Sequence, residues 1–141
     1  MSNVLGIIAE YNPFHNGHLH HLIESKKITN SDYTIAIMSG NFTQRGEVSI
    51  VDKWEKAKMA INNGVDLVIE LPTLYAISSA ENFASGAIKI LNSLGIVDYI
   101  SFGSEAKDIS VLDDIANVLA FEPPQYKTLL SHELARGEYY Q

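Results

Sequence analysis

Four of the five histidines in this chain of 141 residues fall within seven positions: His15, His18, His20 and His21. The first two flank Asn16 and Gly17, so the local order is His-Asn-Gly-His. Imidazoles at the start of a helix can donate hydrogen bonds to phosphate oxygens, and a pKa of about 6.5 lets them carry charge as charge develops. A helix N-terminus adds free N–H groups and a positive dipole end. The pattern favours nucleotidyl transfer, which depends on positioning and on charge stabilisation around phosphorus.

The same histidines allow other interpretations. His15 and His18 could instead cap the helix or face solvent, and His20 could be a partly exposed helix residue. His21 lies three residues after His18 and shares its face of the helix, where it could touch a nucleotide or be partly exposed. A protein-bound zinc ion is disfavoured because no framework such as HExxH accompanies this spacing. Magnesium bound through nucleotide phosphates fits better, and no metal ligand is assigned to the chain.

The pattern of apolar residues along the chain predicts the strands and helices that position the histidines. Short apolar runs predict buried strands at residues 4–9 and 33–38 and two further strands at residues 67–70 and 99–102. Helices are expected to begin near residues 17, 52, 78, 108 and 124. Strands that alternate with helices indicate the α/β class, with a Rossmann-like parallel sheet and helices on both faces. Ligands bind beyond the carboxyl ends of such strands. The unusual sequence lies there, in residues 10–18, 39–47, 71–79 and 103–105.

A second polar loop, residues 39–51, follows the second expected strand and is long for its position. Its candidate ligands are Ser39, Asn41, Gln44 and Arg45. They could hold a small anion, a ribose or an incoming base, with Arg45 as the anion partner, and a solvated loop is the alternative. Asp52 then begins a helix, and Glu55 completes a capping box. The expected buried stripes of the first two helices are Leu19, Leu22 and Ile23, and Trp54, Ala57, Ala60 and Ile61.

Composition narrows the class of protein. The length suits one ordinary domain, and a hydrophobic fraction of 46% is typical of a folded chain. The absence of cysteine excludes disulfides and cysteine-bound metal centres. A net charge of −7 argues against a broadly basic surface that coats nucleic acid. Because the chain has neither a signal peptide nor an apolar run long enough to cross a membrane, a cytoplasmic protein without membrane contact is expected.

Longer strings make the histidine pattern specific. His15 to His18 match the HxGH signature of the nucleotidylyltransferase superfamily, which includes the class I aminoacyl-tRNA synthetases. The strings EYNPFHNGH, MSGNFTQRGEVSIVDKWEKAKMAINNGVDLVIELP, SAENFASGAIKIL and FGSE together resemble the bacterial tRNA(Met) cytidine acetate ligase family, over residues 4–105. The resemblance implies a fold of the HxGH nucleotidylyltransferase type and a two-step reaction. ATP and acetate give acetyl-adenylate, and the acetyl group passes to N4 of the wobble cytidine of elongator tRNA(Met).

The resemblance also implies roles for individual residues. His15 and His18 would be catalytic residues that stabilise charge on the transferring phosphorus and on the leaving pyrophosphate. The expected ATP-binding residues are Ile8, Ala9, Glu10, Tyr11, Asn12, Pro13, Phe14, His15, Asn16, Gly17, His18, Leu19, His20, His21 and Gly103. A side chain at Gly103 would collide with an adenosine lying across the sheet, although an ordinary turn glycine would fit this position too.

A second motif is missing from the sequence. HxGH enzymes pair this loop with a more C-terminal motif that closes over the phosphates, and no KMSKS-like or SxTxxR-like string is present. Since members of the family are much longer, residues 1–141 are expected to be a single ATP-binding domain, an N-terminal fragment without most of the tRNA-binding surface. One alternative is a small-metabolite adenylyltransferase or cytidylyltransferase of the pantetheine phosphate or nicotinamide mononucleotide type. A non-catalytic nucleotide-binding module is the other.

Overall fold

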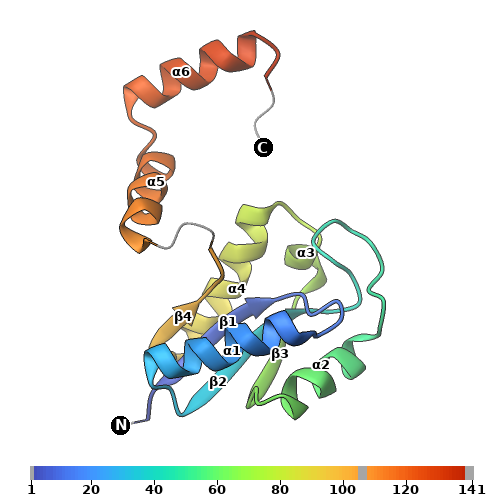
Figure 1. Cartoon of the computed structure of the whole chain (residues 1–141). Coiled ribbons are helices and arrows are strands. Elements are labelled where there is room, and N and C mark those ends of the chain that lie inside the picture. The colour runs from blue at the N-terminus through green and yellow to red at the C-terminus, as the bar shows by residue number, and fades with distance from the viewer. Residues whose placement is uncertain (1, 105–107, 139–141) are drawn as a thin grey trace. The chain divides into compact units, whose positions relative to one another are not determined.

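The computed structural model describes residues 2–104 and 108–138. The chain divides into two compact units, Met1–Gly103 and Ser104–Gln141 (Figure 1). Glu105, the last residue of the FGSE string, lies outside the described residues. The histidine segment, residues 10–21, belongs to the first unit, and so does the second polar loop, which occupies residues 40–52 in the structure.

A four-stranded parallel sheet forms the centre of the first unit. Its strands are β1 (Val4–Ala9), β2 (Tyr33–Ser39), β3 (Leu67–Leu71) and β4 (Tyr99–Ser101), in the order β3-β2-β1-β4. β1 pairs with β2 from Val4 opposite Tyr33 to Ala9 opposite Met38, and β4 pairs with its other edge. This sheet confirms the predicted Rossmann-like fold. Because the strand order reverses at β1, the carboxyl end of β1 is the switch point where such sheets bind ligands.

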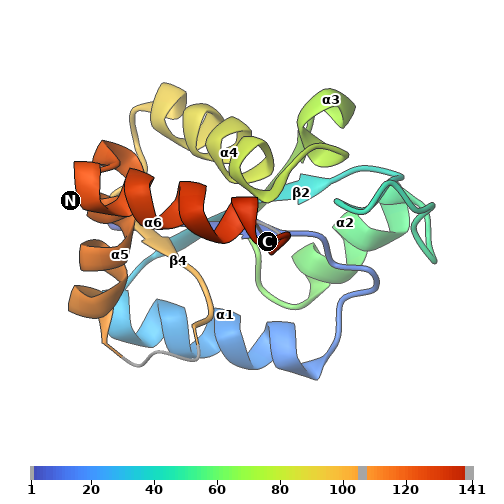
Figure 2. The same cartoon turned by 90° about the horizontal axis from the view of Figure 1, so that it is seen from above.

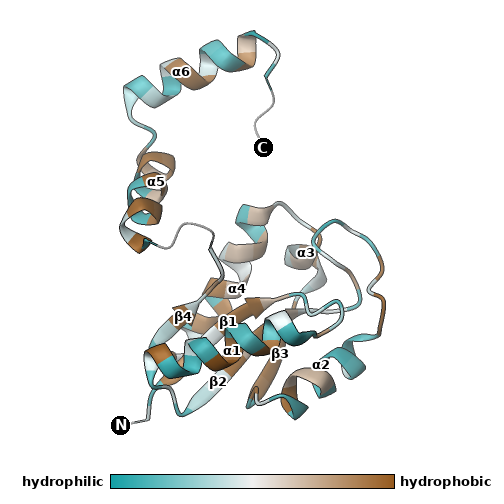
Figure 3. Cartoon of the chain, viewed as in Figure 1, coloured by the Kyte–Doolittle hydropathy of each residue, from teal (hydrophilic) through white to brown (hydrophobic). Residues whose placement is uncertain are grey.

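Helices cover both faces of the sheet, as predicted (Figures 1 and 2). α1 (Asn16–Thr29) and α2 (Lys53–Asn62) pack on one face, and α3 (Thr73–Ala76) and α4 (Ala80–Leu94) on the other. Successive strand residues point to opposite faces. Leu5 and Ile7 therefore join the core beneath α1 and α2, whereas Val4 joins the core beneath α3 and α4. β1 and β3 are largely brown in Figure 3. β1 is a central strand with most of its residues buried, as such a run predicts, whereas β3 is an edge strand and is partly exposed.

The helix ends show which capping signals were correct. Asp52 caps α2 by accepting hydrogen bonds from the N–H groups of Trp54 and Glu55, as predicted. Gly95 ends α4 in the left-handed conformation, with φ of 66°. The cap of α4 is Ser79 rather than Ser78, since the Ser79 oxygen accepts from the Asn82 N–H. The apolar pattern does not predict the single-turn helix α3.

The predicted buried stripes of α1 and α2 are partly wrong. Trp54 is 69% exposed, and Ile23 and Ile61 are also exposed. On α2 the residues that face the sheet are Ala60 and, one helical turn before it, Lys56. Close packing of the small Ala60 against the strands fixes the rotation of α2, and this rotation turns Trp54 outward.

The second unit contains α5 (Ile109–Phe121) and α6 (Pro124–Ala135). Asp108 caps α5, and Pro124 begins α6, which agrees with the helix starts expected near residues 108 and 124. No helix within residues 2–104 and 108–138 is long and apolar enough to cross a membrane.

Candidate functional site

The histidine segment leaves the carboxyl end of β1 and begins α1. His15 is the N-cap of α1, and its Nδ1 accepts a hydrogen bond from the Gly17 N–H at 3.0 Å. The Nδ1 of His18 accepts from the His15 N–H at 3.3 Å, which closes a capping box made of two histidines. The capping interpretation of both residues is therefore confirmed, and each ring performs it with one nitrogen only.

The second nitrogen of each ring decides what the pair can do chemically. Because Nδ1 accepts a backbone N–H, the neutral imidazole carries its proton on Nε2 and presents a donor there. The rings of His15 and His18 stack with their centroids 3.7 Å apart. Burial, and the charges of His15 and His21, lower the pKa of His18 below its ordinary value of 6.5. His18 is thus a neutral N–H donor at neutral pH.

The aromatic side chains of Tyr11 and Phe14 pack against the His18 ring. The ring of Tyr11 lies edge-on to His18, with centroids 5.0 Å apart, and Phe14 packs against both at 4.8 Å and 5.6 Å. Tyr11 is buried, and burial raises its pKa to about 12. It also adopts a positive φ of 49°, which is strained for an aromatic residue and redirects the chain after β1. Tyr11 is therefore part of the support of the histidine pair as well as a turn residue.

Gly17 gives the His15 ring its space. A Cβ at this position would lie 2.9 Å from Cε1 and 3.1 Å from Nδ1 of His15. The missing side chain of Gly17 therefore allows the backbone and the His15 imidazole to approach closely.

Side chains after β1 hold the second polar loop, residues 40–52. A carboxylate oxygen of Glu10 accepts a hydrogen bond from the Gln44 N–H. The Asn12 side-chain oxygen accepts from the Ile50 N–H at 2.7 Å. Together these bonds join the end of β1 to the loop that follows β2.

The amine of Lys56 is a third connection, which the sequence patterns do not predict. Its side chain is fully buried, at 0% exposure. Nζ donates to the Glu10 carbonyl at 3.0 Å, to Ser49 Oγ at 3.1 Å and to Ser39 Oγ at 3.5 Å. Burial lowers the pKa of Lys56, and the nearby carboxylates of Glu10 and Glu70 oppose that shift. One signal could have found Lys56, namely its position four residues before the buried Ala60.

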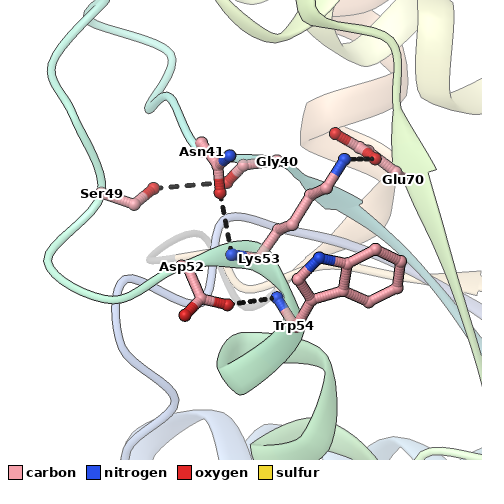
Figure 4. Close-up of polar contacts among 7 residues, drawn as sticks. All are labelled: Gly40, Asn41, Ser49, Asp52, Lys53, Trp54 and Glu70. Carbon is pink, nitrogen blue, oxygen red and sulfur yellow. Dashed lines mark hydrogen bonds and ion pairs between the residues drawn. The ribbon is translucent and has the colours of Figure 1, made fainter.

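A polar cluster at the start of α2 holds the other side of the loop (Figure 4). Asn41 Oδ1 accepts from the Lys53 N–H at 2.9 Å, and Lys53 Nζ forms an ion pair with Glu70 Oε2 at 2.6 Å. Ser49 Oγ donates to the Gly40 carbonyl at 3.3 Å. The exposed Trp54 ring lies beside this cluster, with Lys53 Nζ 5.5 Å from its centroid.

A cavity of about 350 Å³ opens between the two segments. Its lining residues are Glu10, Asn12, Thr43, Gln44, Arg45 and Glu47. Arg45 is exposed, whereas Gln44 is half-buried and donates from its amide to the Ser78 carbonyl at 2.9 Å. The cavity therefore offers a small polar ligand one guanidinium group, two carboxylates and several neutral polar groups.

The predicted site residues occupy different environments. Glu10 and Asn12, directly after β1, are hydrogen-bonded to loop 40–52, and the His15–His18 pair follows them along the chain at the start of α1. Ser39 is buried and donates to the Glu10 carbonyl, and Asn41 is bonded to the start of α2.

Other predicted residues lie further along α1 and at the end of β4. His20 is exposed. His21 bonds through Nε2 to Ser101 Oγ at 3.0 Å, which ties α1 to β4. Gly103 lies two residues beyond β4, and a Cβ there would meet nothing within 4 Å. Among the described residues, no group of three histidine, aspartate or glutamate side chains is placed to hold a metal ion.

Comparisons with known proteins place these features in a family. The chain is 61% identical over 134 residues to the tRNA(Met) cytidine acetate ligase of Acetivibrio thermocellus, and 60% identical over 133 residues to that of Caldanaerobacter subterraneus subsp. tengcongensis. These alignments cover 95% and 94% of this chain but only 32% and 33% of the relatives. The chain thus spans about a third of the length of the curated relatives that it matches, and the resemblance inferred from the sequence strings is confirmed.

A solved structure agrees with the same assignment. The crystal structure of Thermotoga maritima TmcAL bound with alpha-thio ATP is 47% identical to this chain and has a TM-score of 0.92. The match covers 97% of this chain and 33% of that one. Residues 2–141 match the model of the family described as HIGH nucleotidyl transferase. The chain therefore belongs to the HIGH nucleotidyl transferase family.

Proposed function

We propose that this chain is the ATP-binding part of a ligase that activates acetate as acetyl-adenylate and transfers the acetyl group to N4 of the wobble cytidine of elongator tRNA(Met). The observation that carries the proposal is the pair of Nε2 donors of His15 and His18 at the switch point of the sheet. The similarity to proteins named tRNA(Met) cytidine acetate ligase, 61% and 60% identical, supports this choice of substrates.

The first step needs charge stabilisation more than a protein nucleophile. A carboxylate oxygen of acetate bonds to the α-phosphorus of ATP, and the bond from that phosphorus to the bridging oxygen of pyrophosphate breaks. Negative charge grows on the phosphoryl oxygens and on pyrophosphate, where two fixed imidazole N–H donors lower its energy. In the second step the cytidine N4 amine attacks the acetyl carbon and loses a proton, and AMP leaves with the bonding electron pair.

Each ligand has a place in this proposal. The phosphates lie at the N-terminus of α1, whose dipole favours anions, and Mg²⁺ is held through phosphate oxygens. The segment from Ile8 to His21 forms one wall of the ATP site, and adenosine crosses the sheet beside the open space at Gly103. The cavity lined by Glu10 and Arg45 takes the acetate or the incoming cytidine, with Arg45 as the anion partner.

The rest of the reaction needs more than these residues. We propose that a C-terminal remainder, like that of the longer relatives, supplies the second phosphate-binding motif and the basic surface for tRNA in the cytoplasm. A charge of −7 on this chain fits that division. The 141 residues alone are expected to bind ATP weakly, to form little acetyl-adenylate and to give no gel shift with tRNA at physiological salt.

The test uses the full-length protein that carries this chain, with labelled ATP and a panel of small carboxylates. Pyrophosphate exchange that depends on acetate, followed by transfer of the labelled acetyl group to tRNA(Met), is the expected result. Pyrophosphate release only with a phosphorylated metabolite would support a small-metabolite transferase. An inactive protein whose biological role survives the substitution His15→Ala would support a non-catalytic nucleotide-binding module.

A further inference from the structure

The buried amine of Lys56 lies where three parts of the site meet. Its partners are the Glu10 carbonyl directly after β1, Ser39 Oγ at the end of β2, and Ser49 Oγ in loop 40–52. An ammonium group has three protons, so these three acceptors use its full donor capacity. The two serine hydroxyls extend this hydrogen-bond network: Ser39 donates to the Glu10 carbonyl, and Ser49 donates to the Gly40 carbonyl.

We propose that Lys56 is a positioning residue: through the Glu10 carbonyl and Ser49, it fixes the histidine segment against loop 40–52 in the geometry that the reaction needs. The Glu10 carbonyl belongs to the peptide group that enters Tyr11, the residue with positive φ that supports His18. Holding this carbonyl therefore sets the direction in which the histidine segment leaves the sheet. The inference rests on the function proposed above and adds a residue to it.

The surroundings of Lys56 argue against a role in packing alone. A buried ammonium group is costly unless it is paired, and no carboxylate oxygen is among its hydrogen-bond partners. An apolar side chain of similar length would fill the same volume without that cost. What it could not do is donate three hydrogen bonds in three directions, which is what joins β1, β2 and the loop.

The first test measures the geometry in this chain. The amides of Gln44 and Ile50 bond to Glu10 and Asn12, so their hydrogen exchange reports whether the loop stays attached to the segment after β1. In Lys56→Met both amides should exchange about tenfold faster or more, with the buried amide of Ile37 unchanged. Lys56→Arg keeps a charged multiple donor and should restore exchange to within about threefold of the natural chain.

The matched control is Lys58→Met, the same change on the same helix at an exposed residue whose ion pair is with Glu55. It should leave the exchange of Gln44 and Ile50 unchanged. Ser49→Ala is a milder variant that removes one acceptor of the amine and should loosen Ile50 in the same direction, should Lys56→Met fail to fold. Equal acceleration at Gln44, Ile50 and Ile37 in these variants, or no acceleration at all, would overturn the proposal.

The second test measures catalysis in the full-length protein. Lys56→Met should lower kcat for acetate-dependent pyrophosphate exchange by about 30-fold and change KM for ATP less than about threefold, because misplaced reactants lose rate more than binding. A raised KM with unchanged kcat, or no recovery with Lys56→Arg, would contradict a positioning role. If the unaltered protein shows no exchange, the proposed function fails, and the amide measurement still decides the role of Lys56.

Discussion

The imidazole rings of His15 and His18 stack at a centroid distance of 3.7 Å, with their planes 23° apart, while each Nδ1 accepts a backbone N–H of the same helix start. Capping therefore uses one nitrogen of each ring, and the catalytic role proposed for the pair would use the other. The cap orients the two rings through Nδ1, so the Nε2 atom of each ring is available to a ligand. The two roles can be separated by substitutions that keep one atom and remove the other.

His15→Asn should separate capping from catalysis. Asparagine is among the best N-cap residues, so its side-chain oxygen can accept the Gly17 N–H and keep the thermal midpoint within a few degrees. The imidazole Nε2 donor is lost, and pyrophosphate exchange by the full-length protein should fall about 100-fold, as for a lost transition-state donor. His15→Ala, which loses both functions, is the comparison. Full activity in His15→Asn would mean that the ring serves the helix alone.

Folding stability should fall as the solution is made acidic. The pKa values of His18 and His21 are lowered from 6.5 in the folded chain, mainly by burial. The unfolded chain then binds more protons just below pH 6.5, so stability is fully present above that pH and decreases below it. Urea midpoints at pH 5, 6, 7 and 8 measure the effect. His18→Asn should flatten the curve, and a curve that rises toward pH 5 would contradict the assignment.

Gly17→Ala should move the His15 ring without harming the helix. Alanine is a better helix former than glycine, and Gly17 is exposed. Its Cβ, however, would lie 2.9 Å from Cε1 of His15, so the ring must shift. Stability should change by less than about 1 kcal/mol, and exchange activity should fall by about tenfold or more. Gly46→Ala, in the exposed part of loop 40–52, is the comparison variant. It makes the same substitution at a glycine whose φ is positive. Unchanged activity in Gly17→Ala would show that the ring position is not needed.

Gly103→Ala tests where adenosine lies. An added Cβ meets no atom within 4 Å, so the free energy of unfolding should stay within about 0.5 kcal/mol of its original value. ATP binding by the full-length protein should nevertheless weaken, because the methyl group enters the space assigned to the nucleoside. Calorimetry gives both quantities. Equal ATP affinity in the two proteins would place the adenosine elsewhere.

Much of the fold and the location of the site could be predicted from simple patterns. Val4–Ala9 is apolar throughout because β1 is covered on both faces, and such a run indicates a central strand. Asp52 and Gly95 carry their helix-end signals in their own chemistry, an acceptor side chain and a freely rotating backbone. The rule that ligands bind at strand ends then located the histidine segment.

The features that the sequence does not predict depend on contacts between segments that lie far apart in the chain. Lys56 escaped prediction because a charged residue is normally assigned to solvent, and only the serines and carbonyl that surround it make its burial acceptable. Trp54 was expected inside because it is large and apolar, yet Ala60 sets the rotation of α2. Histidine is not a preferred N-cap, so the sequence supports the capping role of His15 and His18 only as an alternative.

The hydrogen bonding of Lys56 also affects whether the amine of Lys56 could itself become acetylated. An acyl phosphate anhydride is an electrophile that reacts with any nearby amine that has a free lone pair. Burial lowers the pKa of Lys56 and so favours the neutral amine, but three acceptors that each bind one of its protons oppose that loss of a proton. The protonated amine has no lone pair, and its side chain is fully buried. Under the proposed function, the same three hydrogen bonds that position the site would therefore also keep the Lys56 amine from being acetylated by the acetyl-adenylate that the enzyme forms.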